Sequence, residues 1–443
     1  MKNNKTLISF FSGALGLDLG LEKAGFALKA VVECNRLALE TIENNTDYLN
    51  GNRQVVIDQA LTLDNVAAIC KSILDKTRLK KNPPFLLAGA PPCQPFSTAG
   101  KRASMRDVRS NGFEVFFKAV GILKPKFFVI ENVKGILSAA KSHRPLAERG
   151  AGFPPLDPDE EHGSAFKEIL DGLSKLSRKH GYCVSWGVVN SADFGCPQVR
   201  DRILFIGSLD GHFVWPEPTH SKERKKGLKK WVTFKKGLKG LNDSEPLYAN
   251  FSSSVSKYLK LIPAGGNWRS LPEKKREDAL GGAFNSWGGR SGFLRRLSWD
   301  RPAPTITSSP KSKATMLCHP EEVRPLTVRE CARIQQFPDT WDFAGSLSQQ
   351  YLQIGNATPV SLGTAIGEAI IKVSRKRKKG IYSKQLLCAD PELLQRIIKR
   401  PKTMLNPTRM RKVKDLQKNC EWLNSNTRYR DEFQKYKAFV SIA

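Results

Sequence analysis

The chain of 443 residues carries 72 Lys and Arg residues against 42 Asp and Glu, a formal net charge of +30. No apolar run approaches the ~20 residues of a membrane span, and the Lys-containing start lacks the apolar core of a signal peptide, so we expect an intracellular protein without a membrane partner. An excess of this size attracts polyanions and makes nucleic acid the leading partner; a basic protein without a specific anionic ligand stays the alternative.

The nine cysteines predict reduced thiols. Their number is odd, and no two of them stand in the Cys-x-x-Cys spacing of zinc sites and redox centres. We therefore expect eight free thiols in a reducing compartment, and no metal site.

Short apolar and β-branched runs alternate with helical patterns through the first half of the chain. Residues 7–11, 27–32, 85–88, 127–130 and 203–206 predict strands, and residues 54–57 are a further candidate. This alternation predicts an α/β fold with a mostly parallel sheet, helices on both faces, and ligands bound beyond the carboxyl ends of the strands.

The first three strand ends carry residues suited to a nucleotide. After the first strand, residues 11–16 form a glycine-containing turn that opens a helix over residues 17–24, where small residues let a cofactor approach the backbone. Glu33 follows the second strand, as does the acidic residue that binds ribose hydroxyls in nucleotide-binding sheets. Asp58 follows the third candidate strand. Either carboxylate could instead cap a helix.

Later strand ends place a thiol, a carboxylate and two guanidiniums together. Cys93 follows two prolines within GAPPCQPFSTAGK, residues 89–101, a corner that cannot continue a sheet and that holds its sulfur in a defined direction. Glu131 follows the strand ending at residue 130, while Arg200 and Arg202 precede another strand and would share one side of an extended segment. The alternatives are a buried structural cysteine, a capping or surface carboxylate and a solvated charge pair.

These segments resemble the DNA (cytosine-5) methyltransferase family, in order and nearly end to end. The matching blocks cover residues 6 to about 369 and are FFSGALGLDLGLEKAGF, VVECN, GAPPCQPFSTAGKR, FFVIENVKGIL, VVNSADFGCPQVRDRILFIG, RPAPTITSS and QIGNATPV. Each short motif recurs by chance, but Pro-Cys-Gln, Glu-Asn-Val and Gln-x-Arg-x-Arg in this order form a highly specific combination. The resemblance implies a Rossmann-like sheet of the S-adenosylmethionine-dependent methyltransferase type, with a smaller target-recognition domain.

The resemblance also implies a covalent mechanism on cytosine within a specific double-stranded DNA sequence. Cys93 would add to carbon 6 of a flipped base, and Glu131 would hydrogen-bond or protonate N3. Arg202 and Arg200 would lower the pKa of the thiol and hold the cytosine carbonyl. S-adenosyl-L-methionine would supply the methyl group, with no metal. The further substrate-binding residues would be Pro92, Gln94, Asn132 and Gln198.

For the cofactor, the resemblance implies a site lined by seven residues: Phe11, Gly13, Gly16, Glu33, Cys34, Asp58 and Asn356. Two residues depart from the family pattern. Leu15 stands where many members have glycine, and Cys34 stands where some have a tryptophan that packs on the adenine, which predicts an altered adenine pocket. The segment of residues 106–114 is also somewhat longer than the spacing usual in the family.

The expected domains are a catalytic and cofactor-binding domain over 1–207, a target-recognition domain over 208–345, a returning segment over 346–371 and a basic extension over 372–443. Residues 265–269 and 286–290 of the second domain are rich in Gly, Asn and Arg, which suit base reading in the major groove or phosphate contacts. The extension is either a solvated tail or an appendage that adds phosphate contacts.

We therefore expect a DNA (cytosine-5) methyltransferase, the modification half of a prokaryotic restriction–modification system. It would be a cytoplasmic, nucleoid-associated monomer whose cognate endonuclease acts on the same site without a stable complex. The alternatives are a transfer-RNA cytosine-5 methyltransferase and a DNA-binding regulator without turnover.

Overall fold

The computed structural model describes residues 5–49, 54–79, 83–92, 111–142, 144, 154–161, 163–223, 226–284, 291–375 and 386–388. Five of the predicted features lie wholly or partly outside the described residues: Cys93, Gln94, residues 106–110 of the segment 106–114, the stretch 286–290, and the extension apart from residues 372–375 and one short strand.

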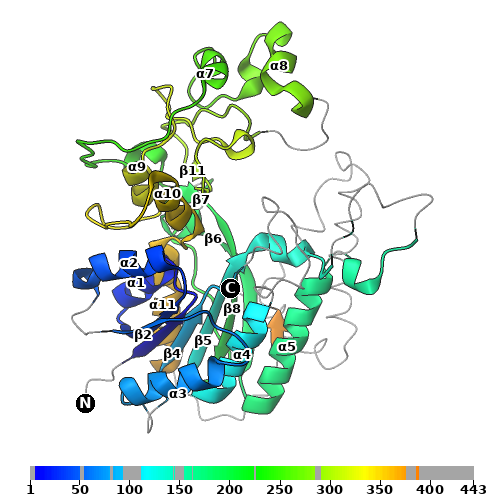
Figure 1. The fold of residues 1–443 in the computed structure, drawn as a ribbon, viewed down its shortest axis with the longest axis vertical. Helices are drawn as coiled ribbons and strands as arrows, with labels where there is room; N and C mark the ends of the chain where they lie inside the picture. The colour runs from blue at the N-terminus through cyan, green and yellow to red at the C-terminus, as the bar shows by residue number, and fades with distance from the viewer. Residues whose placement is uncertain are drawn as a thin grey trace.

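An eight-stranded sheet organises the larger part of the molecule (Figure 1). Five of its strands are parallel neighbours, β8 runs antiparallel to both β5 and β6, and β12 from the basic extension pairs in parallel with β6 at the sheet edge. The mostly parallel α/β fold is thus confirmed. Across the sheet the strands are β12 Leu386–Cys388, β6 Cys183–Asn190, β8 Asp201–Ser208, β5 Phe127–Val133, β4 Leu86–Gly89, β1 Thr6–Phe10, β2 Ala27–Glu33 and β3 Val55–Asp58.

Two strands are longer than the apolar runs that predicted them. β5 continues to Val133, which is paired with Arg202 of β8. Glu131 and Arg202 therefore lie inside strands and not beyond their ends, because the backbone ladder between β5 and β8 continues past the last apolar side chain.

Helices cover both faces of the sheet. Alternate side chains of each strand enter different clusters: Phe127 and Val129 of β5 pack on one face, and Phe128 and Ile130 on the other. Leucines of α1 and α11 fill the first cluster, and apolar residues of α3, α4 and α5 fill the second. The helices of this region are α1 Gly16–Lys23, α2 Arg36–Asn44, α3 Val66–Lys76, α4 Gly112–Leu123, α5 Ser164–His180 and α11 Val360–Arg375.

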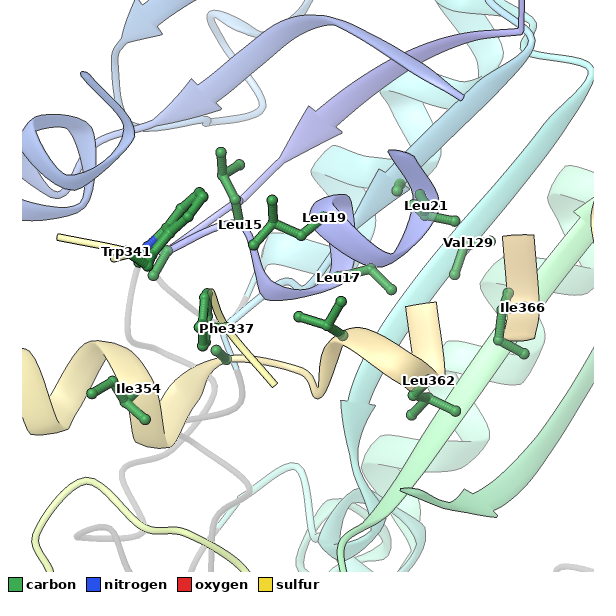
Figure 2. Packing of buried hydrophobic residues seen from close by; sticks show 14 of the residues in the cluster. Leu15, Leu17, Leu19, Leu21, Val129, Phe337, Trp341, Ile354, Leu362 and Ile366 are labelled. Carbon is green, nitrogen blue, oxygen red and sulfur yellow. The ribbon is translucent and has the colours of Figure 1, made fainter. Parts of the chain in front are cut away.

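Small residues let α1 and α11 pack closely. A Cβ at Gly20 would lie 2.2 Å from the Val360 oxygen and 2.7 Å from Cα of Gly363. The C-terminal part of the described chain is thereby packed against the helix that follows β1. Leu17 of α1 and Leu362 of α11 both belong to the apolar cluster at this contact (Figure 2).

A separate small cluster, here called the second core, lies away from the sheet near α7 and α8 (Figure 1). It contains Tyr258, Leu259, Ile262, Trp268, Leu271, Leu280, Leu294, Met316 and Cys318. Regular structure is sparse in this part of the chain: α6 Phe234–Gly237, α7 Ser253–Leu259, α8 Glu273–Leu280, and the two-residue strand pairs β7 Gln198–Val199 with β11 Ala303–Pro304 and β9 His220–Ser221 with β10 Lys229–Lys230.

The chain then returns to the sheet through α9 Val328–Ile334 and α10 Leu347–Asn356. Phe337 and Trp341, between these helices, belong to the same cluster as Leu15 of the first turn (Figure 2). The domain limits stay a prediction. Short 3-10 helices span Thr46–Tyr48, Lys134–Ser138, Pro158–Glu160, Ser191–Phe194, Trp268–Ser270, Gly281–Ala283 and Lys313–Thr315.

None of the helices in the described ranges has the length and apolar character needed to cross a membrane.

Candidate active site

Glu131 and Arg202 form a buried ion pair. Arg202 Nε lies 2.6 Å from Glu131 Oε1, and the two residues are 5% and 8% exposed. In the β5–β8 register Glu131 is opposite Leu204, so Arg202 is its diagonal neighbour on the same face. A carboxylate and a guanidinium are thus held together near the carboxyl end of β5.

The residues that flank Cys93 are anchored to the same place. Asn132 donates from Nδ2 to the Pro91 oxygen at 3.1 Å, which ties the chain after β4 to β5. On the other side of the undescribed stretch 93–110, a Cβ on Gly112 would lie 3.0 Å from Pro91 Cβ and 3.2 Å from Pro92 Cδ. Pro91, Pro92 and Gly112 therefore lie together, and they adjoin Asn132, the residue that follows Glu131.

Positive φ angles shape the turn after β1. Phe11, Gly13 and Leu15 have φ of 54°, 50° and 65°. Leu15 is the N-cap of α1 and is fully buried. At this position, where many members of the resembling family have glycine, the chain therefore combines a left-handed backbone with a core side chain. Figure 2 shows Leu15 packed near Trp341.

Glu33 fixes this turn to the end of β2. Its Oε2 accepts a hydrogen bond from the Gly13 N–H at 2.8 Å, and its Oε1 accepts from the N–H groups of Cys34 and Asn35, each at 2.9 Å. Asp58 is the register partner of Glu33 on β3. Two carboxylates consequently stand side by side at the carboxyl edge of the sheet, next to a constrained turn.

This edge fits a nucleoside cofactor. A Cβ added to Gly13 would meet no atom within 4 Å, so there is open space beside the backbone. Asp58 is exposed, and among the described residues Glu33 Oε2 accepts one hydrogen bond, from the Gly13 N–H, which leaves acceptor capacity for hydroxyl and amine donors. Burial, followed by the Glu33 charge, raises the pKa of the exposed Cys34 thiol, so a neutral thiol borders the site.

Asn356 lies at the end of α10, close to the same turn. A Cβ on Gly16 would lie 2.4 Å from the Thr358 oxygen and 3.0 Å from Ala357 Cβ. The Asn356 side chain is exposed. Residues 341 and 342 positions apart therefore meet at the start of α1.

Arg200 and Gln198 contact partners other than Glu131. Arg200 is 1% exposed, and its guanidinium donates to backbone oxygens of Ile306, Gly355 and Ala357. Arg200 lies between β7 and β8 and belongs to neither strand. The side-chain alternation that would place Arg200 and Arg202 on the same side of one extended segment therefore does not hold there. Of the two arginines, Arg202 is the one that the structure pairs with Glu131.

Asp18 is a buried acidic residue that sequence reasoning did not single out. It lies on α1, its carboxyl contacts Ser9 of β1, and burial raises its pKa to about 7, with a further rise from Glu22. The signal was present in the sequence: Asp18 and Glu22 stand four residues apart in a helix otherwise rich in leucine.

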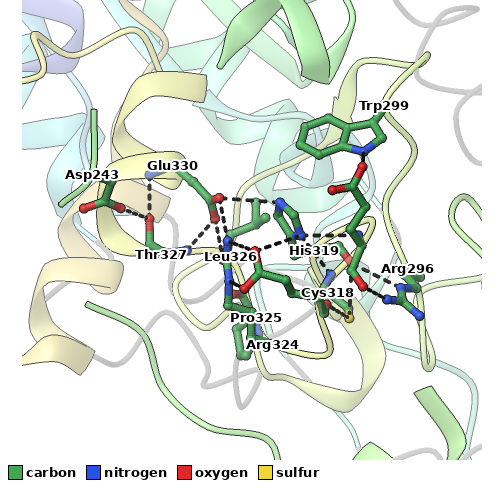
Figure 3. A network of polar contacts seen from close by, with 12 residues as sticks. Asp243, Arg296, Trp299, Cys318, His319, Arg324, Pro325, Leu326, Thr327 and Glu330 are labelled. Atoms are coloured by element: carbon green, nitrogen blue, oxygen red, sulfur yellow. Dashed lines mark hydrogen bonds and ion pairs between the residues drawn. The ribbon is translucent and has the colours of Figure 1, made fainter. Parts of the chain in front are cut away.

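A polar network joins the second core to α9 (Figure 3). Arg324 donates two hydrogen bonds to the Glu330 carboxylate, at 2.8 and 3.0 Å, and Glu330 also accepts from the Thr327 N–H. His319 lies beside Glu330, and burial lowers its pKa. The start of α9 is thereby fixed to the segment that leaves the second core.

Arg296 donates hydrogen bonds to several backbone carbonyls within the second core. It is buried, and it donates to the oxygens of Leu259 at 3.2 Å, Ile262 at 3.1 Å, His319 at 3.3 Å, and Glu321. One side chain thus holds α7, the turn after it and the segment around His319.

The predicted recognition stretch 265–269 is attached to this centre. The Arg296 N–H donates to the Gly266 oxygen at 3.0 Å. The exposed Arg269 guanidinium lies 4.7 Å from the centre of the buried Trp268 ring, a cation–π distance. A cationic group is therefore presented to solvent from a rigid loop. Within the described residues, no group of three or more His, Cys, Asp or Glu could hold a metal ion.

Comparison with known proteins gives a consistent result. A family model described as C-5 cytosine-specific DNA methylase matches residues 5–372. The type II methyltransferase M.Sau96I of Staphylococcus aureus is 34% identical over 82% of this chain and 74% of its own length, and M.PspPI of a Psychrobacter strain is 35% identical over 85% and 81%. A crystal structure described as a prophage-encoded DNA modification methyltransferase of Escherichia coli shares the fold, with a TM-score of 0.52, 23% identity, and coverage of 84% of this chain and 99% of that one.

Proposed function

This chain belongs to the C-5 cytosine-specific DNA methylase family and methylates cytosine in DNA, and from that premise we propose how its residues carry out the reaction. The observation that carries the proposal is the buried Glu131–Arg202 pair, with Oε1 and Nε 2.6 Å apart, beside the strand end that leads to Cys93. Cys93 is the nucleophile, Glu131 the acid that acts on the ring nitrogen, and Arg202 the group that holds the carbonyl.

The chemistry requires a thiolate because carbon 5 of cytosine is a weak nucleophile. The Cys93 thiolate adds to carbon 6, and the displaced electron pair moves toward N3, where Glu131, which takes up a proton when the base binds, delivers that proton. Carbon 5 becomes nucleophilic and takes the methyl group, which would break its bond to the sulfur of S-adenosylmethionine and leave S-adenosylhomocysteine, and the N3 proton returns to Glu131. Loss of the carbon 5 proton to a base then drives elimination of the thiolate, which restores the aromatic ring. Because stacking hides the ring faces in a duplex, the target base must be flipped out.

Arg202 orients Glu131 for this task. The ion pair fixes the carboxyl rotamer, so that one oxygen faces the arginine and the other is available for N3 and the exocyclic amine. Contact with the amine excludes thymine, which carries a carbonyl at that position. Asn132 and Pro92 shape the adjoining wall of the base pocket, Asn132 through its bond to the Pro91 oxygen.

S-adenosylmethionine, when bound, supplies the methyl group. Glu33 and Asp58 would accept hydrogen bonds from its ribose and adenine, and Phe11, Gly13 and Gly16 would line the methionine side. Cys34 borders the adenine, and Asn356 closes the site. The open space beside Gly13 and the two adjacent carboxylates support this placement.

The second core is the target-recognition part, and its substrate is a specific duplex sequence. The charge of +30 and the exposed Arg269 on its rigid loop support binding to DNA. The names of the bacterial relatives, type II methyltransferases, support a role as the modification enzyme of a restriction–modification system, acting in the cytoplasm as a monomer, with a cognate endonuclease that acts separately.

Transfer of a radiolabelled methyl group in vitro tests the proposal. The purified protein is incubated with labelled S-adenosylmethionine and unmethylated duplex DNA, and in parallel with transfer RNA. We expect label in cytosine of the duplex only, and none with Cys93→Ala. Label in transfer RNA would support an RNA methyltransferase, DNA binding without transfer would support a regulator, and transfer by Cys93→Ala would contradict the covalent mechanism.

A further inference from the structure

Two arginines of the Gln-Val-Arg-Asp-Arg run, two positions apart, have unlike surroundings. Arg202 pairs with the Glu131 carboxylate. Arg200 instead donates to three backbone oxygens: Ile306 from Nη1 at 2.8 Å, and Gly355 and Ala357 from Nη2 at 2.7 and 2.9 Å. With 1% exposure, its charge is stabilised by carbonyl dipoles that fix its position.

The three carbonyls belong to two segments that flank the predicted active site. Ile306 follows β11, which pairs with β7. Gly355 and Ala357 stand on either side of Asn356, so Arg200 holds the backbone immediately before and after the residue expected to close the cofactor site. The exposed Asn356 side chain therefore projects from a backbone fixed at both flanks.

Two glutamines complete the arrangement. Gln198 accepts from the Ile306 N–H at 2.7 Å and donates to Gln335 Oε1 at 2.9 Å. Gln335 in turn donates to the Ala357 oxygen at 3.1 Å. The Ala357 oxygen thus accepts from both Arg200 and Gln335, which uses both of its lone pairs. All three side chains lie in the buried interior.

The held segment touches the cofactor turn directly. Ala357 and Thr358 lie against Gly16, where a Cβ would come within 2.4 Å of the Thr358 oxygen. A Cβ on Gly355 would lie 2.4 Å from the Ser308 nitrogen, so the segment is also packed against the chain after β11. A displacement of residues 355–358 is therefore transmitted to the start of α1, because neither contact has room to absorb it.

We propose that Arg200 is a positioning residue, which with Gln198 and Gln335 clamps residues 355–358 against the cofactor turn and does not contact the cytosine. This inference rests on the proposed cofactor and cytosine sites. The two arginines then have different roles: Arg202 holds the cytosine carbonyl and orients Glu131, and Arg200 sets the geometry of the cofactor site. The consequence is that Arg200 contributes to cofactor affinity before any DNA is bound.

The test compares Arg200→Lys with Arg202→Lys in the full chain. Calorimetry without DNA measures the Kd of S-adenosylhomocysteine and, from the stoichiometry, the folded fraction; single-turnover methylation at saturating cofactor measures the rate of transfer. For Arg200→Lys we expect a Kd raised about tenfold, equivalent to about 1.4 kcal/mol, with a rate within about threefold of wild type. For Arg202→Lys we expect an unchanged Kd and a rate lowered about 100-fold or more.

Gln335→Met is the second variant, because Arg200→Lys could fail to fold. It keeps the side-chain volume, removes the donor to the Ile354 and Ala357 oxygens and the acceptor for Gln198, and leaves both arginines in place. The clamp predicts a raised Kd with the rate retained; a role of Arg200 on cytosine predicts no change. A wild-type Kd of S-adenosylhomocysteine in Gln335→Met would overturn the inference. So would folded Arg200→Lys that has a wild-type Kd together with a lowered rate of transfer.

The outcomes also separate this inference from the proposed function. Wild-type protein that binds S-adenosylhomocysteine but transfers no methyl group to duplex DNA would contradict the proposed reaction, while a raised Kd in both variants would still support the clamp. Wild-type transfer with unchanged Kd values in the variants would contradict the clamp alone. Wild-type protein that binds no S-adenosylhomocysteine would contradict both.

Discussion

The sheet core and the second core differ in what holds them together. The sheet is covered by two large apolar clusters, one on each face, and its strands are joined by a continuous ladder. The second core has nine buried apolar residues and little regular structure, and the buried Arg296 holds several of its segments by their carbonyls. The first arrangement gives rigid strand ends on which chemistry can be placed, and the second fixes loops that lack a ladder of their own.

The largest expected effect follows from Glu131→Gln at the sheet edge. The amide oxygen can still accept from Arg202, so the fold is retained, but the proton for N3 is lost. We expect turnover to fall by about 10²- to 10⁴-fold, with cofactor affinity unchanged.

Glu330→Gln is the matched control, because Glu330 is also a buried carboxylate paired with an arginine, but in the polar network next to the second core. It should lower stability and leave the single-turnover rate at saturating DNA within about threefold of wild type. Equal loss of that rate in both variants would contradict the division of roles between the two regions.

Arg296→Met should disrupt the second core with little effect on the sheet. The substitution leaves up to four carbonyl oxygens without this donor, at a cost of about 3 kcal/mol or more in the free energy of unfolding. DNA binding measured by fluorescence anisotropy should weaken strongly, while the Kd of S-adenosylhomocysteine should not change.

The neighbouring Arg295 provides the control, since within the described part of the chain its side chain donates to one backbone oxygen, that of Met316. Arg295→Met should cost about 1 kcal/mol. If Arg296→Met bound DNA as wild type does, the second core would not depend on this arginine.

Leu15→Gly tests whether the sheet side tolerates a return to the residue common in the family. Glycine relieves the left-handed backbone at φ 65°, worth about 1–2 kcal/mol, but removal of a fully buried leucine costs about 2–5 kcal/mol. The packing term is larger, so denaturant unfolding should show a loss of about 1–3 kcal/mol. A gain in stability would mean that backbone strain outweighs the contact with the core.

The effect that depends most on pH is expected for Asp18→Asn. Burial raises the pKa of this carboxyl from 3.8 to about 7, so between these values the folded state holds a proton that the unfolded state lacks. The stabilising contribution is fully present below about pH 4 and is lost as the pH rises to about 7. The variant should therefore gain thermal stability relative to wild type on going from pH 4 to pH 8. A difference in Tm that is independent of pH would exclude an ionising Asp18.

The sequence predicted six of the eight strands of the sheet, because apolar runs and their spacing are local properties, but it did not predict β6 or β12. The carboxylates at the ends of β2 and β3 follow from the same pattern, whereas the pairing of Glu131 with Arg202 of β8 does not. The antiparallel direction of β8 was not predicted, because strand pairing depends on residues far apart. The contacts of Arg200 were missed for the same reason: its carbonyl partners are 106 to 157 positions away. The strand β12, contributed by the basic extension, has only three residues and no distinguishing pattern.

The most direct test is to express the protein in a host that lacks cytosine methylation and to sequence the genomic DNA after bisulfite conversion, with Cys93→Ala as the control. The account predicts protected cytosines within one short duplex motif, and none in the control. Soluble protein that protects no cytosine, or equal protection in the Cys93→Ala strain, would contradict it.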